Sequence, residues 1–81
     1  MSKVIVADDH IIFRYGLVRL LTKNGFEVIA EADNAIELRE QIAINPQADI
    51  VVSDCKMPGS GPLANLSYIQ EKFPDLKVLF I

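Results

Sequence analysis

The sequence has little cysteine and little positive charge, and each shortage excludes a class of protein. Cys55 is the single cysteine among 81 residues, so an intramolecular disulfide is impossible, which fits a cytoplasmic protein. Eight Lys and Arg residues stand against eleven Asp and Glu residues, the net charge is −3, and the basic residues are scattered. No basic patch can therefore follow a nucleic-acid backbone, and we expect no direct DNA binding by this segment.

Long hydrophobic runs are also missing. The longest apolar runs have the length of a strand, and no basic-then-apolar leader opens the chain. We therefore expect a soluble protein, located in the cytoplasm and without membrane contact. A chain of 81 residues forms one small domain at most, and a hydrophobic content of 51% is high for that length. We therefore expect the apolar core to need more residues around it than this chain supplies to shield it from water.

What the sequence does contain is an alternation of strand and helix patterns. The β-branched run at residues 50–52 leads to Asp54, and Pro58 and Gly59 follow as stop signals, which predicts a strand buried on both faces. The expected strands are residues 3–7, 26–30, 50–53 and 77–81. The expected helices are residues 11–24, 35–44 and 62–73. This order predicts an α/β fold with a parallel sheet, in a single domain over residues 1–81.

Local signals place the helix ends and the buried face of each helix. Asn24-Gly25 closes the first helix, Asn34 and Glu37 form a capping pair for the second, and Gly61-Pro62 supplies the cap and first position of the third. Apolar residues at helical spacing are expected to face the core. They are Phe13, Leu17, Leu20 and Leu21 in the first helix, Ala35, Leu38 and Ile42 in the second, and Leu66, Ile69 and Phe73 in the third.

Acidic residues follow two of the expected strands. Asp8 and Asp9 come directly after residues 3–7, and Asp54 follows residues 50–53. The carboxyl ends of parallel strands meet at one edge of the sheet, where ligands bind in open α/β sheets, so three carboxylates are expected to converge there. Their mutual repulsion favours a divalent cation, and oxygen-only ligation suits Mg²⁺, since no His or Cys cluster points to zinc. One carboxylate could also act as a nucleophile toward phosphorus.

At this point the residues resemble a known family. Asp8-Asp9-His10 after the first strand, Asp54 after the third, and Met57-Pro58-Gly59 behind it are similar to the receiver domain of two-component response regulators. Arg14 shortly after the acidic pair resembles the subfamily whose receivers precede a helix-turn-helix DNA-binding domain. The resemblance implies a flavodoxin-like sheet of order 2-1-3-4, here incomplete because the fifth strand and its flanking helices are absent.

The resemblance also implies a role for each site residue. Asp54 is expected to accept a phosphoryl group from a sensor histidine kinase and so switch a transcriptional output, with DNA contacted only through an absent effector domain. Mg²⁺ would be held by Asp9 directly, by Asp8 mainly through water, by Asp54, and by the backbone carbonyl of Lys56. The Lys56 side chain would lie beside the phosphate. Such a domain is a switch, and we do not expect an enzyme beyond self-catalysed aspartyl phosphorylation and dephosphorylation.

The sequence departs from the family pattern in two ways. The family's Ser or Thr after the fourth strand and its Lys at the end of the fifth lie beyond Ile81. Residues 77–81 are therefore expected to form an apolar edge strand, which either pairs in a homo-oligomer or leaves the chain marginally folded. In addition, Ser60-Gly61-Pro62 places a glycine early in the loop after Met57-Pro58-Gly59.

Several alternatives stay open. A truncated receiver could act as a phosphorylation-independent interaction or dimerisation module. A flavin-binding protein with the same sheet order is disfavoured because Asp8-Asp9-His10 stands where a phosphate cradle would need Gly, Ser and Thr. Asp8 and Asp9 could also cap the first helix. We expect His10 to be exposed and structural, and Cys55 to be a small packing residue.

A second apolar strip lies on the first helix. Ile11, Tyr15 and Val18 recur at helical spacing on the side away from Phe13, Leu17 and Leu20. In receivers the first helix belongs to the kinase-docking face, so this strip is a candidate partner-docking site. The alternative is that the missing last helix covers it.

Overall fold

The computed structural model describes the backbone of residues 1–59 and 62–81 and the side chains of residues 1–59 and 66–81. Strands and helices alternate along the chain. The elements in order are β1 (Lys3–Ala7), α1 (Ile11–Lys23), β2 (Glu27–Ala32), α2 (Ala35–Ile44), β3 (Ile50–Ser53), α3 (Pro62–Lys72) and β4 (Lys77–Phe80). No helix of these residues is both long and apolar enough to cross a bilayer.

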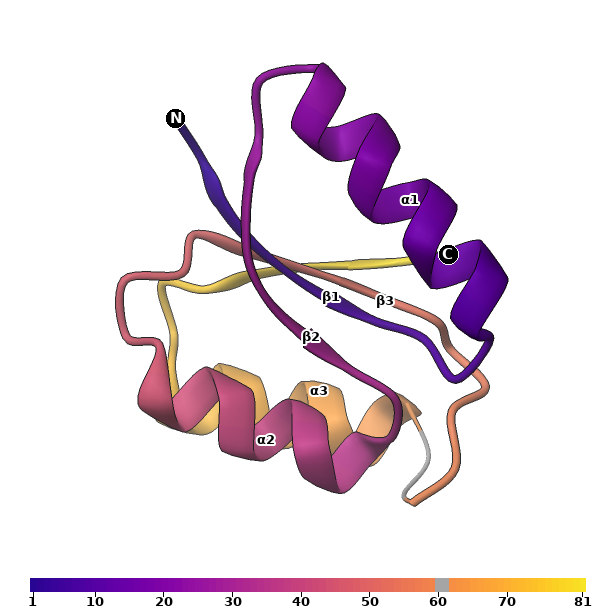
Figure 1. Cartoon of the computed structure of the whole chain (residues 1–81). Helices are drawn as coiled ribbons and strands as arrows, with labels where there is room; N and C mark the ends of the chain where they lie inside the picture. Colours follow the sequence, from indigo (N-terminus) through magenta and orange to yellow (C-terminus); the bar gives the residue numbers. More distant parts are fainter. Residues whose placement is uncertain (60–61) are drawn as a thin grey trace.

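The four strands form one parallel sheet in the order β2-β1-β3-β4. Figure 1 shows α1 on one face of this sheet and α2 and α3 side by side on the other. The α/β class and the strand order expected from the sequence are thus confirmed. The reason is visible in β1, where Val4, Ile5, Val6 and Ala7 are all 0% exposed, because helices cover a central strand from both sides.

Each face of the sheet carries its own hydrophobic cluster. Ile5, Ala7 and Val51 pack with residues of α2 and α3, chiefly Leu38, Ile42 and Ile69. Val4, Val6 and Val52 point to the opposite face, where residues of α1 pack against them. Alternate residues of a strand point to opposite faces, so the continuous apolar run of β1 serves both clusters.

The helix ends follow the local signals. The Asn34 side chain accepts a hydrogen bond from the Glu37 backbone N–H at 2.7 Å, and the Glu37 carboxylate accepts one from the backbone N–H of Asp33 at 3.2 Å. The capping pair expected from the sequence is confirmed. Gly25 ends α1 with a φ of +89°, a conformation that a residue without Cβ adopts at no steric cost. The cap expected at Gly61 lies outside the described residues.

Several predicted boundaries need correction. β2 spans Glu27–Ala32 because it follows β1 from Lys3 to Ala7, with an irregular register between Val4 and Ile5. Phe26 stays in the preceding turn, where its N–H donates to the Leu21 carbonyl at 3.0 Å. β4 ends at Phe80, although the Ile81 N–H still donates to the Ser53 carbonyl at 2.9 Å. The ends of α1 and α3 differ from the expected ends by one residue.

The predicted buried face of α1 is partly wrong. Leu17 and Leu21 pack on the sheet as expected, but Val18 joins them, whereas Phe13 is 54% exposed and Leu20 is 59% exposed. Successive helical residues are rotated by about 100°, so Leu17, Val18 and Leu21 share one face, and Phe13 and Leu20 lie at its margin. Val18 therefore does not belong to a fully exposed docking strip, although Ile11 and Tyr15 remain 70% and 62% exposed.

Candidate functional site

The acidic residues lie where β1 and β3 end side by side. Ala7 pairs with Ser53 in the last register position of the two strands. The backbone then continues in parallel, because the Asp54 N–H donates to the Ala7 carbonyl at 2.8 Å and the Asp8 N–H donates to the Ala32 carbonyl at 3.0 Å. Sheet hydrogen bonds thus fix the backbone that carries Asp8 and Asp54.

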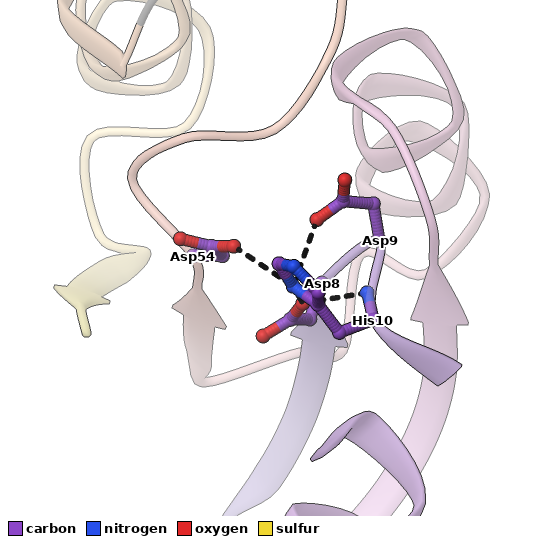
Figure 2. A group of neighbouring side chains, drawn as sticks. All are labelled: Asp8, Asp9, His10 and Asp54. Atoms are coloured by element: carbon purple, nitrogen blue, oxygen red, sulfur yellow. Dashed lines mark hydrogen bonds and ion pairs between the residues drawn. The ribbon is translucent and has the colours of Figure 1, made fainter. Parts of the chain in front are cut away.

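Side chains from both strand ends point toward one another (Figure 2). One ligand atom from each of Asp8, Asp9, His10 and Asp54 lies within 4.8 Å of all the others. The convergence expected of the three carboxylates is therefore present. Their exposure differs: the side chain of Asp8 is 3% exposed, that of Asp54 15%, and that of Asp9 34%.

Asp8 is the buried member of the group, and its Oδ1 and backbone carbonyl accept hydrogen bonds. Its Oδ1 accepts hydrogen bonds from the backbone N–H and the ring Nδ1 of His10, both at 2.8 Å. Its backbone carbonyl accepts a hydrogen bond from Nη1 of Arg14 at 2.6 Å, while Nε of Arg14 donates to Glu31 at 3.0 Å. Arg14 thereby joins α1 to the end of β1 and to β2, a role that the sequence pattern did not reveal.

His10 lies among the carboxylates. Its Nδ1 is 2.8 Å from Asp8, 3.1 Å from Asp9 and 3.7 Å from Asp54, while its side chain is 70% exposed. The hydrogen bond to Asp8 raises the pKa of His10 above its ordinary value, and the negative charges of Asp9, Asp8 and Asp54 add to this effect, while desolvation opposes it. The expected exposure is correct, but the local pattern did not indicate this position within the cluster.

The loop after β3 carries the remaining predicted site residues. Lys56 is exposed, and its backbone N–H donates to Oδ1 of Asp54 at 3.1 Å, which orients that carboxylate. Met57 is buried in the cluster formed with α2 and α3. The carbonyl of Pro58 accepts a hydrogen bond from the N–H of Ala35 at 2.9 Å. This contact fixes the loop against the first turn of α2, and the free Cys55 is half-buried within it.

The donor set fits a small hard cation. Carboxylate oxygens are the ligands that Mg²⁺ takes from proteins, at about 2.0–2.1 Å, so two donors of one ion lie at most about 4.2 Å apart. All donor atoms of the group lie within 4.8 Å of one another, which is close to that limit. Asp8, Asp9 and Asp54 can therefore share one ion without a change in the fold.

Comparison with known proteins decides the family. The model of the response regulator receiver domain matches residues 4–81. The chain belongs to this family. Among curated receiver proteins, response regulator GacA of Pseudomonas syringae pv. syringae is 37% identical over 83 residues, which cover 100% of this chain and 38% of GacA. The chain thus spans well under half the length of that relative.

Solved receiver structures have the same fold. A chain of the CheX–CheY–BeF₃–Mg²⁺ complex from Borrelia burgdorferi superposes with a TM-score of 0.91 at 28% identity, covering 98% of this chain and 60% of that one. RcsB from Salmonella enterica serovar Typhimurium, bound to promoter rprA with phosphomimetic BeF₃⁻, gives a TM-score of 0.86 at 27% identity, covering 99% of this chain and 68% of that one. The receiver fold implied by the sequence is therefore confirmed.

Proposed function

We propose that this receiver domain accepts a phosphoryl group on Asp54 from a sensor histidine kinase, with Mg²⁺ bound by Asp8, Asp9, Asp54 and the backbone carbonyl of Lys56. The observation that carries the proposal is the convergence of the three carboxylates at the ends of β1 and β3. The CheX–CheY structure with BeF₃ and Mg²⁺ supports it by similarity.

The chemistry uses few groups. An oxygen of the Asp54 carboxylate forms a bond to phosphorus while the phosphorus–nitrogen bond of a kinase phosphohistidine breaks, and the freed imidazole takes up a proton. The Lys56 N–H holds Oδ1 of Asp54, which leaves Oδ2 facing the cluster for attack. A Mg²⁺ ion held by these residues would neutralise the negative charge of the carboxylates and of the phosphoryl oxygens. Positioning and charge neutralisation account for most of the catalysis in such transfers.

The relatives also support a proposal for the output of the whole protein. We propose that phosphorylation of this domain switches transcription in the cytoplasm through a DNA-binding domain outside these residues, as the RcsB–promoter structure suggests by similarity. The domain then acts as a switch and catalyses at most its own phosphorylation and dephosphorylation.

The direct test is phosphorylation by a small donor. The 81-residue chain incubated with acetyl phosphate and Mg²⁺ is expected to gain the mass of one phosphoryl group, measured on the intact protein. Asp54→Asn should abolish the gain, whereas Asp33→Asn, at an exposed position outside the cluster, should leave it unchanged. Equal gains in the protein and in Asp54→Asn would contradict the proposal.

Ile11 and Tyr15 remain candidates for kinase docking. Both are exposed on α1, and with Arg14 and Val18 they line a shallow groove. We propose that this groove receives the kinase. Ile11→Ser combined with Tyr15→Ser should reduce transfer from a histidine kinase without lowering thermal stability or transfer from acetyl phosphate. A loss of stability would instead show that the two residues pack in the folded domain.

A second candidate function is self-association through β4. This strand pairs only with β3, so its outer edge has no strand partner among the described residues. Leu79 and Ile81 are 52% and 46% exposed beside that edge. An apolar edge strand is a template for pairing with a second copy, which would make the chain a dimerisation module independent of phosphate.

Sedimentation tests this second candidate. The protein should form dimers, and Leu79→Lys should dissociate them because the charge repels a second edge. Ile36→Lys, at a residue that is 64% exposed on α2, serves as a matched control that should leave the dimer intact. A stable, cooperatively melting monomer at high concentration would exclude the dimerisation function.

A further inference from the structure

His10 provides the cluster with a nitrogen donor besides its oxygen donors. Its Nδ1 lies 2.8 Å, 3.1 Å and 3.7 Å from oxygens of Asp8, Asp9 and Asp54. In Figure 2 the ring stands between the carboxylates of Asp9 and Asp54, above that of Asp8. The ring nitrogen therefore faces the space that a cation bound by these three residues would use.

The geometry allows Nδ1 to become a ligand. All four donors lie within 4.8 Å of one another, so the small side-chain movements that bring the carboxylates onto one ion also admit the imidazole. The side chain of His10 is 70% exposed and free to make this adjustment. With its proton on Nε2, the neutral ring presents the Nδ1 lone pair to the ion while Nε2–H faces water.

The donor set then changes the preference of the site. Mg²⁺ takes oxygen ligands and keeps several waters, so an imidazole adds little to its binding. Divalent ions of the first transition row accept imidazole readily, and their affinity for mixed nitrogen and oxygen sites rises from Mn²⁺ through Co²⁺ and Ni²⁺ to Cu²⁺. One histidine among three carboxylates thus favours these ions over Mg²⁺.

We propose that His10 is a metal ligand through Nδ1 and gives the acidic site of this receiver a preference for divalent first-row transition ions. The proposal rests on the proposed function in that both use the same three carboxylates. The ligand role differs from an alternative in which the His10 ring only neutralises the carboxylates and moves away when an ion binds. In that alternative His10 competes with every cation, so its removal would strengthen binding.

The test compares Co²⁺ and Mg²⁺ binding by calorimetry. All proteins carry Cys55→Ser, because the half-buried thiol next to Asp54 is a second potential ligand for soft ions. His10→Asn replaces the imidazole by an amide and suits the N-cap position of α1, so the fold should be retained. Co²⁺ affinity should fall at least about tenfold, whereas Mg²⁺ affinity should change less than about threefold.

A spectroscopic measurement identifies the ligand independently. His10 is the only histidine in the chain, so a nitrogen hyperfine coupling of imidazole type in the pulsed EPR spectrum of bound Mn²⁺ must come from it. The coupling should be present in the unsubstituted chain and lost in His10→Asn. Asp9→Asn serves as a positive control, because loss of this carboxylate should weaken the binding of both Co²⁺ and Mg²⁺.

The possible outcomes separate the two proposals. Unchanged or tighter Co²⁺ binding in His10→Asn, or a parallel loss of both ions, would overturn the ligand role of His10 and leave the phosphoacceptor proposal standing. Binding of Co²⁺ without any Mg²⁺ binding would contradict the Mg²⁺-dependent function and support His10. A chain that binds neither ion would contradict both.

Discussion

Asp8 and His10 form the tightest contact of the acidic edge. The Asp8 side chain is only 3% exposed, so its carboxylate gains little from bulk water, and its Oδ1 accepts two hydrogen bonds from His10. The ring of His10 in turn gains three negative neighbours. In the metal-free protein these carboxylates therefore stabilise the protonated form of the His10 ring.

This contact gives a pH dependence whose sign is defined. Because the pKa of His10 is raised above 6.5 in the folded state, its stabilising contribution is fully present below 6.5 and is lost as the pH rises through the folded-state pKa. NMR titration of the single histidine in metal-free protein should give a pKa above 6.5, and Asp8→Asn should lower it. A titration at or below 6.5 in the unsubstituted chain would contradict the contact.

Arg14 joins three elements through a side chain that is 16% exposed. Its Nη1 donates to the backbone carbonyl of Asp8 while its Nε donates to the carboxylate of Glu31. A lysine, with a single nitrogen, cannot make both hydrogen bonds in this geometry. Arg14→Lys should lower the free energy of unfolding by about 1–2 kcal/mol, measured by urea denaturation. Arg19→Lys on the exposed side of α1 is the matched control and should change it by less than about 0.5 kcal/mol. Equal effects of the two changes would be inconsistent with this role.

The loop between β3 and α3 depends on the conformation of Gly59. Its φ is +116°, and a Cβ at this position would lie 2.9 Å from Cβ of Ala35 in α2. Gly59→Ala should therefore destabilise the fold by about 1–3 kcal/mol, since both strain and collision oppose it. A Cβ added at Gly16 in α1 would have no atom within 4 Å. Gly16→Ala should therefore raise the free energy of unfolding by about 0.5–1 kcal/mol. Thermal melts of both variants test this, and a stable Gly59→Ala protein would refute the close contact.

Strands and caps were more predictable than helix orientation. The run from Val4 to Ala7 and the pair Asn34 and Glu37 act through adjacent residues, so the sequence contained the information needed for β1 and for the start of α2. The face of α1 depends on where the sheet lies below it. Phe13 and Leu20 have the spacing of core residues, yet α1 turns Leu17, Val18 and Leu21 to the sheet, which the helical pattern alone could not decide.

Across the whole molecule, the two faces of the sheet are covered unequally. Val78 of β4 packs in the cluster with α2 and α3, whereas Leu79 points to the α1 face and is 52% exposed. α1 contacts β1 and β2, and Val52 of β3 is still buried beneath it, so the open part of that face lies over β4. There Phe13, Ile12 and Ile81 line a hollow of about 610 Å³ that reaches Asp8 and Asp54.

The acidic site could be predicted from the sequence because parallel strand ends meet at one edge. Asp8, Asp9 and Asp54 converge as expected, since the pairing of Ala7 with Ser53 brings the two strand ends together. The position of His10 could not be predicted from the local pattern alone, because its ring also approaches Asp54, which only the pairing of β1 with β3 brings near.

Binding of beryllofluoride, a mimic of the phosphoryl group, tests the central claim most directly. Fluorine NMR of the 81-residue chain should show a bound fluoride signal only when Mg²⁺ is present, and both Asp54→Asn and Asp9→Asn should remove it. The account requires this joint dependence, because the carboxylate of Asp54 and the cation act on the same group. The same bound signal without Mg²⁺, or in Asp54→Asn, would contradict it.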